Sequence, residues 1–333
     1  MPTVLIIGAG VLGTSMAIGL KTAGYEVFLH DTNRSVLQKA AKISGASTKE
    51  CNPDLVIVAT PPASTADLAQ QALKKYPQAI VADIASTKSL IAAEVNNERF
   101  IPTHPMAGSE KTGPIHAHGS LFHGANWVVC RRNKSIEDMV KALGATPIFL
   151  NPQQHDEAVA LVSHLPQLFA SILAAQLVGK PEEYVQLAGQ GLRDTTRIAA
   201  SNPKLWQQII ASNQQALEPL MKETYQQFQQ LDLNKTQDLI AQGNEGHRAI
   251  PVKRAHKTGE YMTASIAIDD KPGQWAALLN TVAAANINVE DMRMEHAPQQ
   301  RIGVVKLLLA ADKVETLHKV VEPQWEILDV EEE

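Results

Sequence analysis

Several features that mark specialised proteins are scarce in this 333-residue sequence. Its two cysteines, Cys51 and Cys130, are too few for a disulfide framework or a cysteine-based metal cluster. The formal net charge is −5, so no excess of basic charge favours binding to nucleic acid or to an acidic membrane. We find no apolar run of the roughly 20 residues needed to span a bilayer. An apolar strand pattern starts almost at once, so we expect no signal peptide and a cytoplasmic location.

The strongest local pattern that is present lies near the start of the chain. The apolar run Val4–Ile7 predicts a buried parallel strand, and it leads directly into Gly8-x-Gly10-x-x-Gly13. A helical pattern follows, and a second apolar strand ends at Asp31, which is the context that a dinucleotide-binding fingerprint requires. The three glycines permit, in order, a tight turn, close approach of a pyrophosphate and close helix packing. We therefore expect a dinucleotide with its phosphates at the helix N-terminus.

Asp31 favours NAD over NADP. Its carboxylate would accept hydrogen bonds from the adenosine ribose hydroxyls and would repel a 2′-phosphate. Arg34 is the opposing signal, because its guanidinium could instead face such a phosphate. The residues expected to contact the cofactor lie in the glycine turn, at the second strand end and after the third strand: Gly8, Gly10, Val11, Leu12, Gly13, Asp31, Thr60 and Pro61.

The pattern along the chain changes twice, and the length suits two or three domains. Over residues 1–150, apolar strand patterns alternate with helical ones, which predicts an α/β, doubly wound, mostly parallel Rossmann-type sheet. Residues 151–250 carry no strand pattern and predict an all-helical substrate and dimerisation domain. Residues 260–333 predict the order βαββαβ of a ferredoxin-like module. The expected strands of the first domain are 4–7, 25–30, 55–60, 79–84, 127–130 and 147–150, and long helices are expected over 157–177 and 205–228.

Four further stretches offer the groups that hydride transfer needs, a base for a hydroxyl and a cation for a carboxylate. In chain order they are Asp83-Ile-Ala-Ser86-Thr-Lys88, His104-Pro-Met-Ala-Gly108-Ser-Glu110-Lys-Thr-Gly113, His155 with Ser163-His164-Leu-Pro166, and Thr196-Arg197-Ile198-Ala199. Their order and spacing resemble the prephenate dehydrogenases, the tyrosine-pathway family that includes arogenate and cyclohexadienyl dehydrogenases. Gln167 departs from the pattern, because many relatives have a histidine there. The tail, with Asp270-Lys-Pro272-Gly273, resembles an ACT regulatory domain.

The resemblance implies oxidative decarboxylation of prephenate to 4-hydroxyphenylpyruvate with NAD. His104 would accept the proton of the C4 hydroxyl while hydride leaves C4, and Ser86 would orient His104 and the cofactor. Arg197 would hold a substrate carboxylate through its planar fork. Glu110 would order the entrance, and His164 would lie on the helical wall beside the substrate.

Each of these side chains also has a simpler structural interpretation. His104 could be a turn residue, Ser86 a helix cap, Arg197 an interhelical ion pair and His164 a satisfied core histidine. The remaining candidates are interpreted as structural (His155), as a ribose contact or cap (Lys88), or as loop residues without a metal (His116, His118 and His123).

Three other functions remain as alternatives. The first is the same reaction on arogenate, which no pattern separates from prephenate. The second is a β-hydroxyacid dehydrogenase. Those enzymes use a catalytic lysine on the first long interdomain helix, and the corresponding region here has no lysine before Lys180, which disfavours this alternative. The third is a non-catalytic NAD and amino-acid sensing module.

Two partners are expected besides the substrate. The alanine- and leucine-rich helical region predicts a homodimer. The tail is expected to bind L-tyrosine as a feedback inhibitor, since a turn that opens a helix offers N–H groups to a carboxylate. A purely structural dimerisation tail is the alternative. The predicted effector residues are Asp270, Pro272, Gly273, Asn286 and Asn288.

Overall fold

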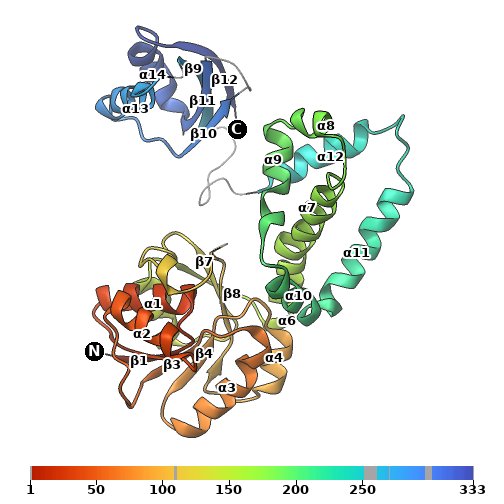
Figure 1. Ribbon diagram of the computed structural model, residues 1–333. Coiled ribbons are helices and arrows are strands. Elements are labelled where there is room, and N and C mark those ends of the chain that lie inside the picture. The colour runs from red at the N-terminus through yellow and green to blue at the C-terminus, as the bar shows by residue number, and fades with distance from the viewer. Residues whose placement is uncertain (1, 109–110, 251–260, 270, 297–301, 333) are drawn as a thin grey trace. The chain divides into compact units, whose positions relative to one another are not determined.

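The computed structural model describes residues 2–108, 111–250, 261–269, 271–296 and 302–332 (Figure 1). Glu110, Asp270 and the polar stretch 253–259 lie outside these residues. The chain forms two compact units. The first comprises Met1–Val178 with Thr196–Gln226, and the second comprises Gly179–Thr195 with Gln227–Glu333.

A five-stranded parallel sheet forms the core of the first unit, in the order β2-β1-β3-β4-β5 (Figure 1). Alternate residues of its strands pack on different helices: Val4 and Ile6 share a core with α1, whereas Leu5 shares one with α3. The chain runs from β1 outward to β2 and returns to β3, so the strand order reverses beside β1, where such sheets bind ligands at the carboxyl ends of their strands. The elements are β1 (Thr3–Ile7), α1 (Val11–Thr22), β2 (Glu26–His30), α2 (Arg34–Ser44), β3 (Leu55–Val58), α3 (Pro62–Lys75), β4 (Ile80–Asp83), α4 (Ser89–Glu94) and β5 (Phe100–Ile101).

The last strands of this domain correct the prediction of one continuous sheet. They form a separate three-stranded sheet in the order β6-β7-β8, in which β6 and β7 are antiparallel and β7 and β8 are parallel. Pro102 separates β5 from β6, and a proline has no N–H to continue a strand ladder. The elements are β6 (Thr103–Pro105), η1 (Pro114–His116), β7 (Asn126–Val129), α5 (Lys134–Ala142) and β8 (Thr146–Phe149).

Residues 152–175 form one helical run that contains a π-helical segment before Pro166. By length and composition alone this run could cross a membrane, contrary to the expectation that no apolar stretch is long enough. His155, Asp156 and His164 within it are nevertheless buried and hydrogen-bonded to other parts of the first unit, although only 28% of its most apolar window is buried. The elements are α6 (Pro152–Val159), η2 (Ala160–His164) and α7 (Leu165–Ala175).

The single long helix expected over residues 205–228 is instead two helices. They are α10 (Pro203–Ser212) and α11 (Gln214–Gln229), and the break lies at Asn213. The Asn213 side chain is 3% exposed and forms hydrogen bonds inside the first unit, so tertiary contacts end α10 at this point. A short 3-10 helix, η3 (Arg197–Ala200), packs against α7.

The second unit contains three helices of the predicted helical region and a four-stranded antiparallel sheet. The helices are α8 (Glu182–Gln186), α9 (Gln190–Thr196) and α12 (Gln237–Arg248). The sheet has the order β10-β11-β9-β12 and shares an apolar core with two helices. The observed βαββαβ order matches the prediction, with β9 (Tyr261–Asp269), α13 (Gln274–Ala284), β10 (Asp291–His296), β11 (Ile302–Ala310), η4 (Ala311–Lys313), α14 (Val314–Val321) and β12 (Glu326–Glu332).

Residues 287–289 do not begin a strand, contrary to the prediction, because they follow the cap of α13. Asn286 is left-handed, with φ 54°. Its N–H donates to the carbonyl of Ala283, and the N–H of Ile287 donates to that of Val282, which is the Schellman pattern. The cap explains an asparagine at position 286 without any ligand. The Asn288 amide donates to the Glu290 carboxylate.

Candidate active site

The glycine turn after β1 has the shape that a dinucleotide requires. A Cβ on Gly8 would lie 2.4 Å from the carbonyl oxygen of Ala59, and one on Gly13 would lie 2.0 Å from that of Gly8. Gly8 also has φ +108°, which disfavours any other residue. Among the described residues, a Cβ on Gly10 would meet no atom within 4 Å. Two glycines are therefore required by packing, and the third leaves space in front of the turn.

The groups around the turn fit NAD. Gly10 is the N-cap of α1 and provides no side-chain cap, so the N–H groups at the start of this helix are available to a phosphate. Val11 and Leu12 are the first residues of that helix. The Asp31 carboxylate accepts hydrogen bonds from the N–H of Ala9 and of Asn33, both at 2.8 Å, and each oxygen keeps a lone pair for a ribose hydroxyl.

Thr60 marks the opposite side of the expected cofactor site, after β3. Its buried Oγ1 has no hydrogen-bond partner in the described part of the chain, which is an unusual state for a buried hydroxyl. Pro61 is the N-cap residue of α3 and likewise has no side-chain cap to offer. A polar cofactor group would satisfy the Thr60 hydroxyl.

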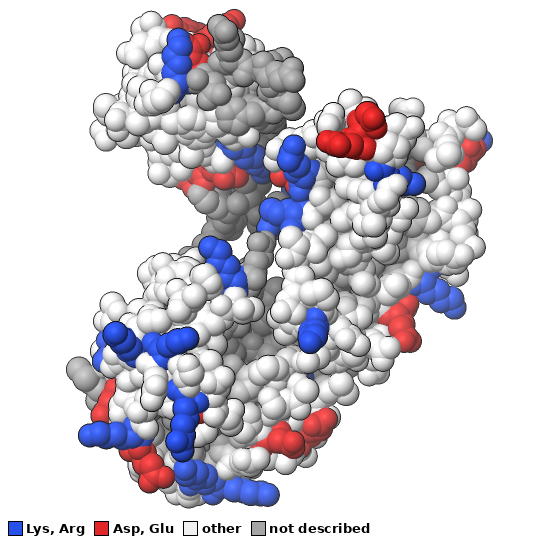
Figure 2. Space-filling view, in the orientation of Figure 1, with Lys and Arg blue, Asp and Glu red and all other residues white. Residues whose placement is uncertain are grey.

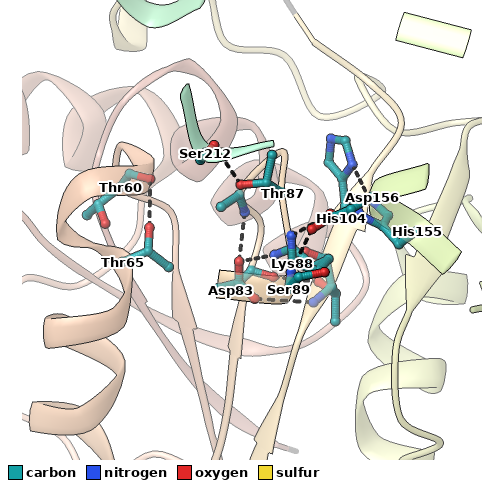
Figure 3. A network of polar contacts seen from close by, with 12 residues as sticks. Thr60, Thr65, Asp83, Thr87, Lys88, Ser89, His104, His155, Asp156 and Ser212 are labelled. Carbon is teal, nitrogen blue, oxygen red and sulfur yellow. Dashed lines mark hydrogen bonds and ion pairs between the residues drawn. The ribbon is translucent and has the colours of Figure 1, made fainter. Parts of the chain in front are cut away.

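A buried ion pair joins Asp83 on β4 to Lys88 before α4, and both residues form hydrogen bonds with Thr103 on β6. Lys88 and Asp83 are both fully buried and in contact, and the Lys88 ammonium also donates to the carbonyl of Thr103 at 2.9 Å (Figure 3). Asp83 Oδ1 accepts from the N–H of Thr103 at 3.3 Å. The Lys88 ammonium is thus committed to Asp83 and Thr103, which corrects its interpretation as a ribose contact. The same contacts fix the strand that carries the next residue, His104.

His104, His155 and Asp156 form a hydrogen-bonded row. The distance from His104 Nδ1 to His155 Nε2 is 2.9 Å, and that from His155 Nδ1 to Asp156 Oδ1 is 2.8 Å (Figure 3). Asp156 also accepts hydrogen bonds from the N–H groups of Lys88 and Ser89, both at 2.8 Å. The carboxylate on α6 therefore caps α4 and holds His155 at the same time.

The row has the charge state that a proton acceptor needs. Burial lowers the pKa of His104 well below its ordinary value, and His155, Lys88 and His164 lower it further, so the ring is neutral at pH 7. Burial raises the pKa of Asp156, but the hydrogen bonds from His155, Ser89 and Lys88 more than offset this, and the net pKa is lowered. Asp156 thus remains a carboxylate.

His164 is buried on η2 beside the Trp206 indole, with ring centroids 6.0 Å apart in an edge-to-face arrangement. Its Nδ1 lies 3.0 Å from the side-chain nitrogen of Asn213. Burial lowers the pKa of His164 to about 4, with His155 acting in the same direction and Asp156 against it. His164 is therefore a neutral polar group at pH 7.

The structure brings some predicted residues together and leaves others apart. His104 and His164 lie close enough that His164 helps to lower the pKa of His104, whereas Ser86 is half-buried and makes no hydrogen bond to His104 among the described contacts. Arg197 is exposed at the start of η3. Asp156 and Asn213 were missed, because His155 and Asp156 precede the helix predicted over 157–177 and no local pattern marks Asp156 or Asn213.

Comparison with known proteins identifies this arrangement. A parallel sheet with an intact dinucleotide turn and a half-buried neutral histidine defines the chain as an NAD-dependent dehydrogenase. The family model for the nucleotide-binding domain of prephenate dehydrogenase matches residues 16–146, and that for its dimerisation domain matches residues 151–245. The chain belongs to the prephenate dehydrogenase family.

Individual relatives agree with this assignment. The prephenate dehydrogenase of Lactococcus lactis is 28% identical, over 89% of this chain and 91% of that protein. The crystal structure of Aquifex aeolicus prephenate dehydrogenase with hydroxyphenyl propionate and NAD+ superposes with a TM-score of 0.63 at 26% identity, over 74% of this chain and 93% of the other. The crystal structure of Synechocystis arogenate dehydrogenase gives a TM-score of 0.64 at 25% identity, over 74% of this chain and 99% of the other.

Proposed function

We propose that the protein oxidises and decarboxylates prephenate to 4-hydroxyphenylpyruvate. The observation that carries this proposal is His104: a half-buried, neutral imidazole on β6, in a chain with an intact dinucleotide turn. His104 takes the proton of the substrate hydroxyl, and bound NAD supplies the hydride acceptor. Loss of carbon dioxide makes the ring aromatic and the reaction effectively irreversible.

The remaining predicted residues have supporting roles in this proposal. Arg197 binds a substrate carboxylate, Glu110 orders the entrance, and Ser86 lies near His104 and the cofactor. His164 offers a neutral ring to the substrate. The cofactor lies on Gly8, Gly10, Val11, Leu12 and Gly13, with Asp31 at its ribose and Thr60 and Pro61 on the other side.

The choice of prephenate over arogenate rests on the relatives, whose names include both substrates. The test is the rate of NADH formation by the full chain with prephenate and with arogenate, each repeated with NADP. We expect the highest kcat/KM with prephenate and NAD. A higher value with arogenate would assign the protein to that substrate, and no turnover with either would overturn the proposal and favour a sensing module.

The helical region of residues 151–250 is proposed to form a homodimer through its apolar surface. The family model for this region is named a dimerisation domain. In Figure 2, most of the surface over α7 and α11 is neither acidic nor basic. Sedimentation at micromolar concentration should give a dimer, and a monomer would refute this. The exposed large apolar side chains of the first unit include Leu161, Val162, Ile172, Leu205, Met221 and Tyr225.

The tail is proposed to be an ACT-type regulatory domain that binds L-tyrosine. The βαββαβ order supports a ferredoxin-like module, and Gly273 opens α13 in a left-handed conformation at the expected turn. With this tail, the proposed domains are 1–150, 151–250 and 260–333 of a soluble cytoplasmic enzyme. L-tyrosine should inhibit the full chain but not a chain ending at Ile250. Equal inhibition of both would mean competition at the active site. The proposed effector contacts are Asp270, Pro272, Gly273, Asn286 and Asn288.

A further inference from the structure

His155 and Asp156 have no part in the reaction as proposed above, yet they are buried directly behind its proton acceptor. His155 is 0% exposed and Asp156 is 3% exposed. Both lie on α6, whereas His104 lies on β6, 51 residues earlier in the chain than His155. The rings of His104 and His155 meet edge to face, with centroids 5.1 Å apart. Such a buried polar row must have each of its protons placed, because an unmatched donor or acceptor would be costly.

The hydrogen-bond partners place these protons when both rings are uncharged. The Asp156 carboxylate can only accept, so Nδ1 of His155 carries a hydrogen and donates it. A neutral His155 then has a bare Nε2, which must accept from Nδ1–H of His104. A neutral His104 in turn has a bare Nε2. The lone pair needed for a substrate proton is therefore on the one ring nitrogen of His104 that the row does not use.

We propose that His155 is a positioning residue that holds His104 in this tautomer and accepts its Nδ1 proton during the reaction. The proposal rests on the proposed role of His104. The substrate hydroxyl proton moves to Nε2 of His104, and the Nδ1 proton of His104 moves to Nε2 of His155. The hydride moves from the substrate carbon to NAD. Asp156 stays ionised beside the His155 imidazolium. The added positive charge is therefore on His155 and not on His104.

The charges around His155 favour this transfer. On the segment from β4 to β6, the Lys88 ammonium and the Asp83 carboxylate form an ion pair and compensate each other. His164, on η2, is neutral. Burial raises the pKa of the Cys130 thiol, which follows β7, to about 12, so this thiol is neutral as well. Among these groups, the Asp156 carboxylate is the charge left over, and it contacts His155 directly. A buried imidazolium is stabilised by such a partner.

The first test is His155→Gln in the full-length protein. We expect kcat to fall about tenfold or more with KM for prephenate little changed, as for loss of support to a general base. The acid limb of the kcat/KM profile should move to lower pH, because the variant lacks the imidazole that, beside the Asp156 carboxylate, takes up the proton at low pH. His247→Gln, an exposed histidine on α12, is the matched control and should change neither quantity.

The two proposals fail in different ways. An unchanged kcat and acid limb in His155→Gln, together with loss of turnover in His104→Asn, would overturn the role of His155 and leave the proposed function standing. Absence of turnover by the wild-type chain with prephenate and arogenate would overturn the proposed function instead.

A second measurement applies even if the variant does not fold. Nitrogen-15 NMR of wild-type protein with labelled histidine rings reports which nitrogen of each ring carries hydrogen, and His104→Asn identifies the His104 signals. We expect hydrogen on Nδ1 and a bare Nε2 in both His104 and His155. A His104 ring protonated on Nε2 would overturn the proposal.

Discussion

Asn213 donates a hydrogen bond from its side-chain amide to Nδ1 of His164, at 3.0 Å. The same nitrogen donates to the backbone carbonyl of Asp156 at 2.9 Å, and because a carbonyl only accepts, this contact fixes the orientation of the amide. Nδ1 of His164 is therefore unprotonated, and its Nε2 carries the hydrogen. Protonating His164 would break this hydrogen bond inside a buried site.

His164 should make the protein less stable in mild acid. Its folded-state pKa of about 4 lies below the ordinary value of 6.5, so between these values the unfolded chain binds a proton that the folded chain does not. The free energy of unfolding is not reduced by this group above pH 6.5. It falls as the pH drops toward 4, by at most about 1.4 kcal/mol per pH unit for this group. Urea unfolding of wild type and His164→Gln over this range should show a shallower slope in the variant. Equal slopes would contradict the prediction, and His247→Gln is the control.

His104→Asn tests the proton acceptor. Asparagine keeps a polar side chain of similar reach but cannot take the substrate proton. We expect kcat to fall about 100-fold or more with KM little changed, as for removal of a general base. Steady-state kinetics with prephenate and NAD measure both, and a near-normal kcat would remove His104 from the mechanism.

Arg197→Ala tests the proposed carboxylate contact. We expect KM for prephenate to rise roughly 10- to 1000-fold, the scale of losing a charge-assisted pair, and Arg197→Lys to restore only part of it, because an ammonium lacks the planar fork. Arg193→Ala, a neighbouring exposed arginine on α9, is the control. An unchanged KM with lowered stability would instead indicate a structural ion pair.

Asp31 should control the choice of cofactor. Asp31→Ala removes the carboxylate that repels a 2′-phosphate and leaves Arg34 available, so the preference for NAD over NADP should fall about tenfold or more. The change also removes the acceptor for Ala9 and Asn33. Asp31→Asn, which keeps an acceptor without the charge, separates the two effects. A wild type that already prefers NADP would show the assignment to be wrong.

Lys88→Met should strongly destabilise the protein. It leaves the Asp83 carboxylate buried without its cation, and breaking such a pair costs about 3–5 kcal/mol. Denaturant unfolding measures the loss. The double change Lys88→Met with Asp83→Leu should recover part of it, since no charge then remains buried. A loss below about 1 kcal/mol in the single variant would show that the carboxylate is satisfied by its other donors.

The sequence predicted the parallel sheet because each strand carries its own signal. The apolar runs of β1, β3 and β4 and the glycine turn are local patterns, and all were found in place. The separate sheet was missed because it depends on pairing of residues 103–105 with 127–129, which lie far apart in sequence. The break at Asn213 was missed for the same reason, since only its tertiary hydrogen bonds end the helix.

The site shows the same division. The role of His104 was predicted from a motif of contiguous residues, and the dinucleotide contacts from another, and both stay predictions. The importance of His155 and Asp156 was not visible, because it arises from partners on β6 and at the start of α4. A histidine followed by an aspartate is common in helices, so the role of this pair can be inferred only from its hydrogen-bond partners.

The hydrogen bonds of Asp156 have a consequence for biosynthesis of the chain. The N–H of Ser89 donates to the Asp156 carboxylate, which lies 67 residues later in sequence. While the protein is being translated, β1 to β5 are complete before Asp156 has been added, and α4 lacks its cap until then. The nascent dinucleotide-binding half therefore leaves the ribosome with the loop that follows β4 unfinished, and only the arrival of α6 completes it.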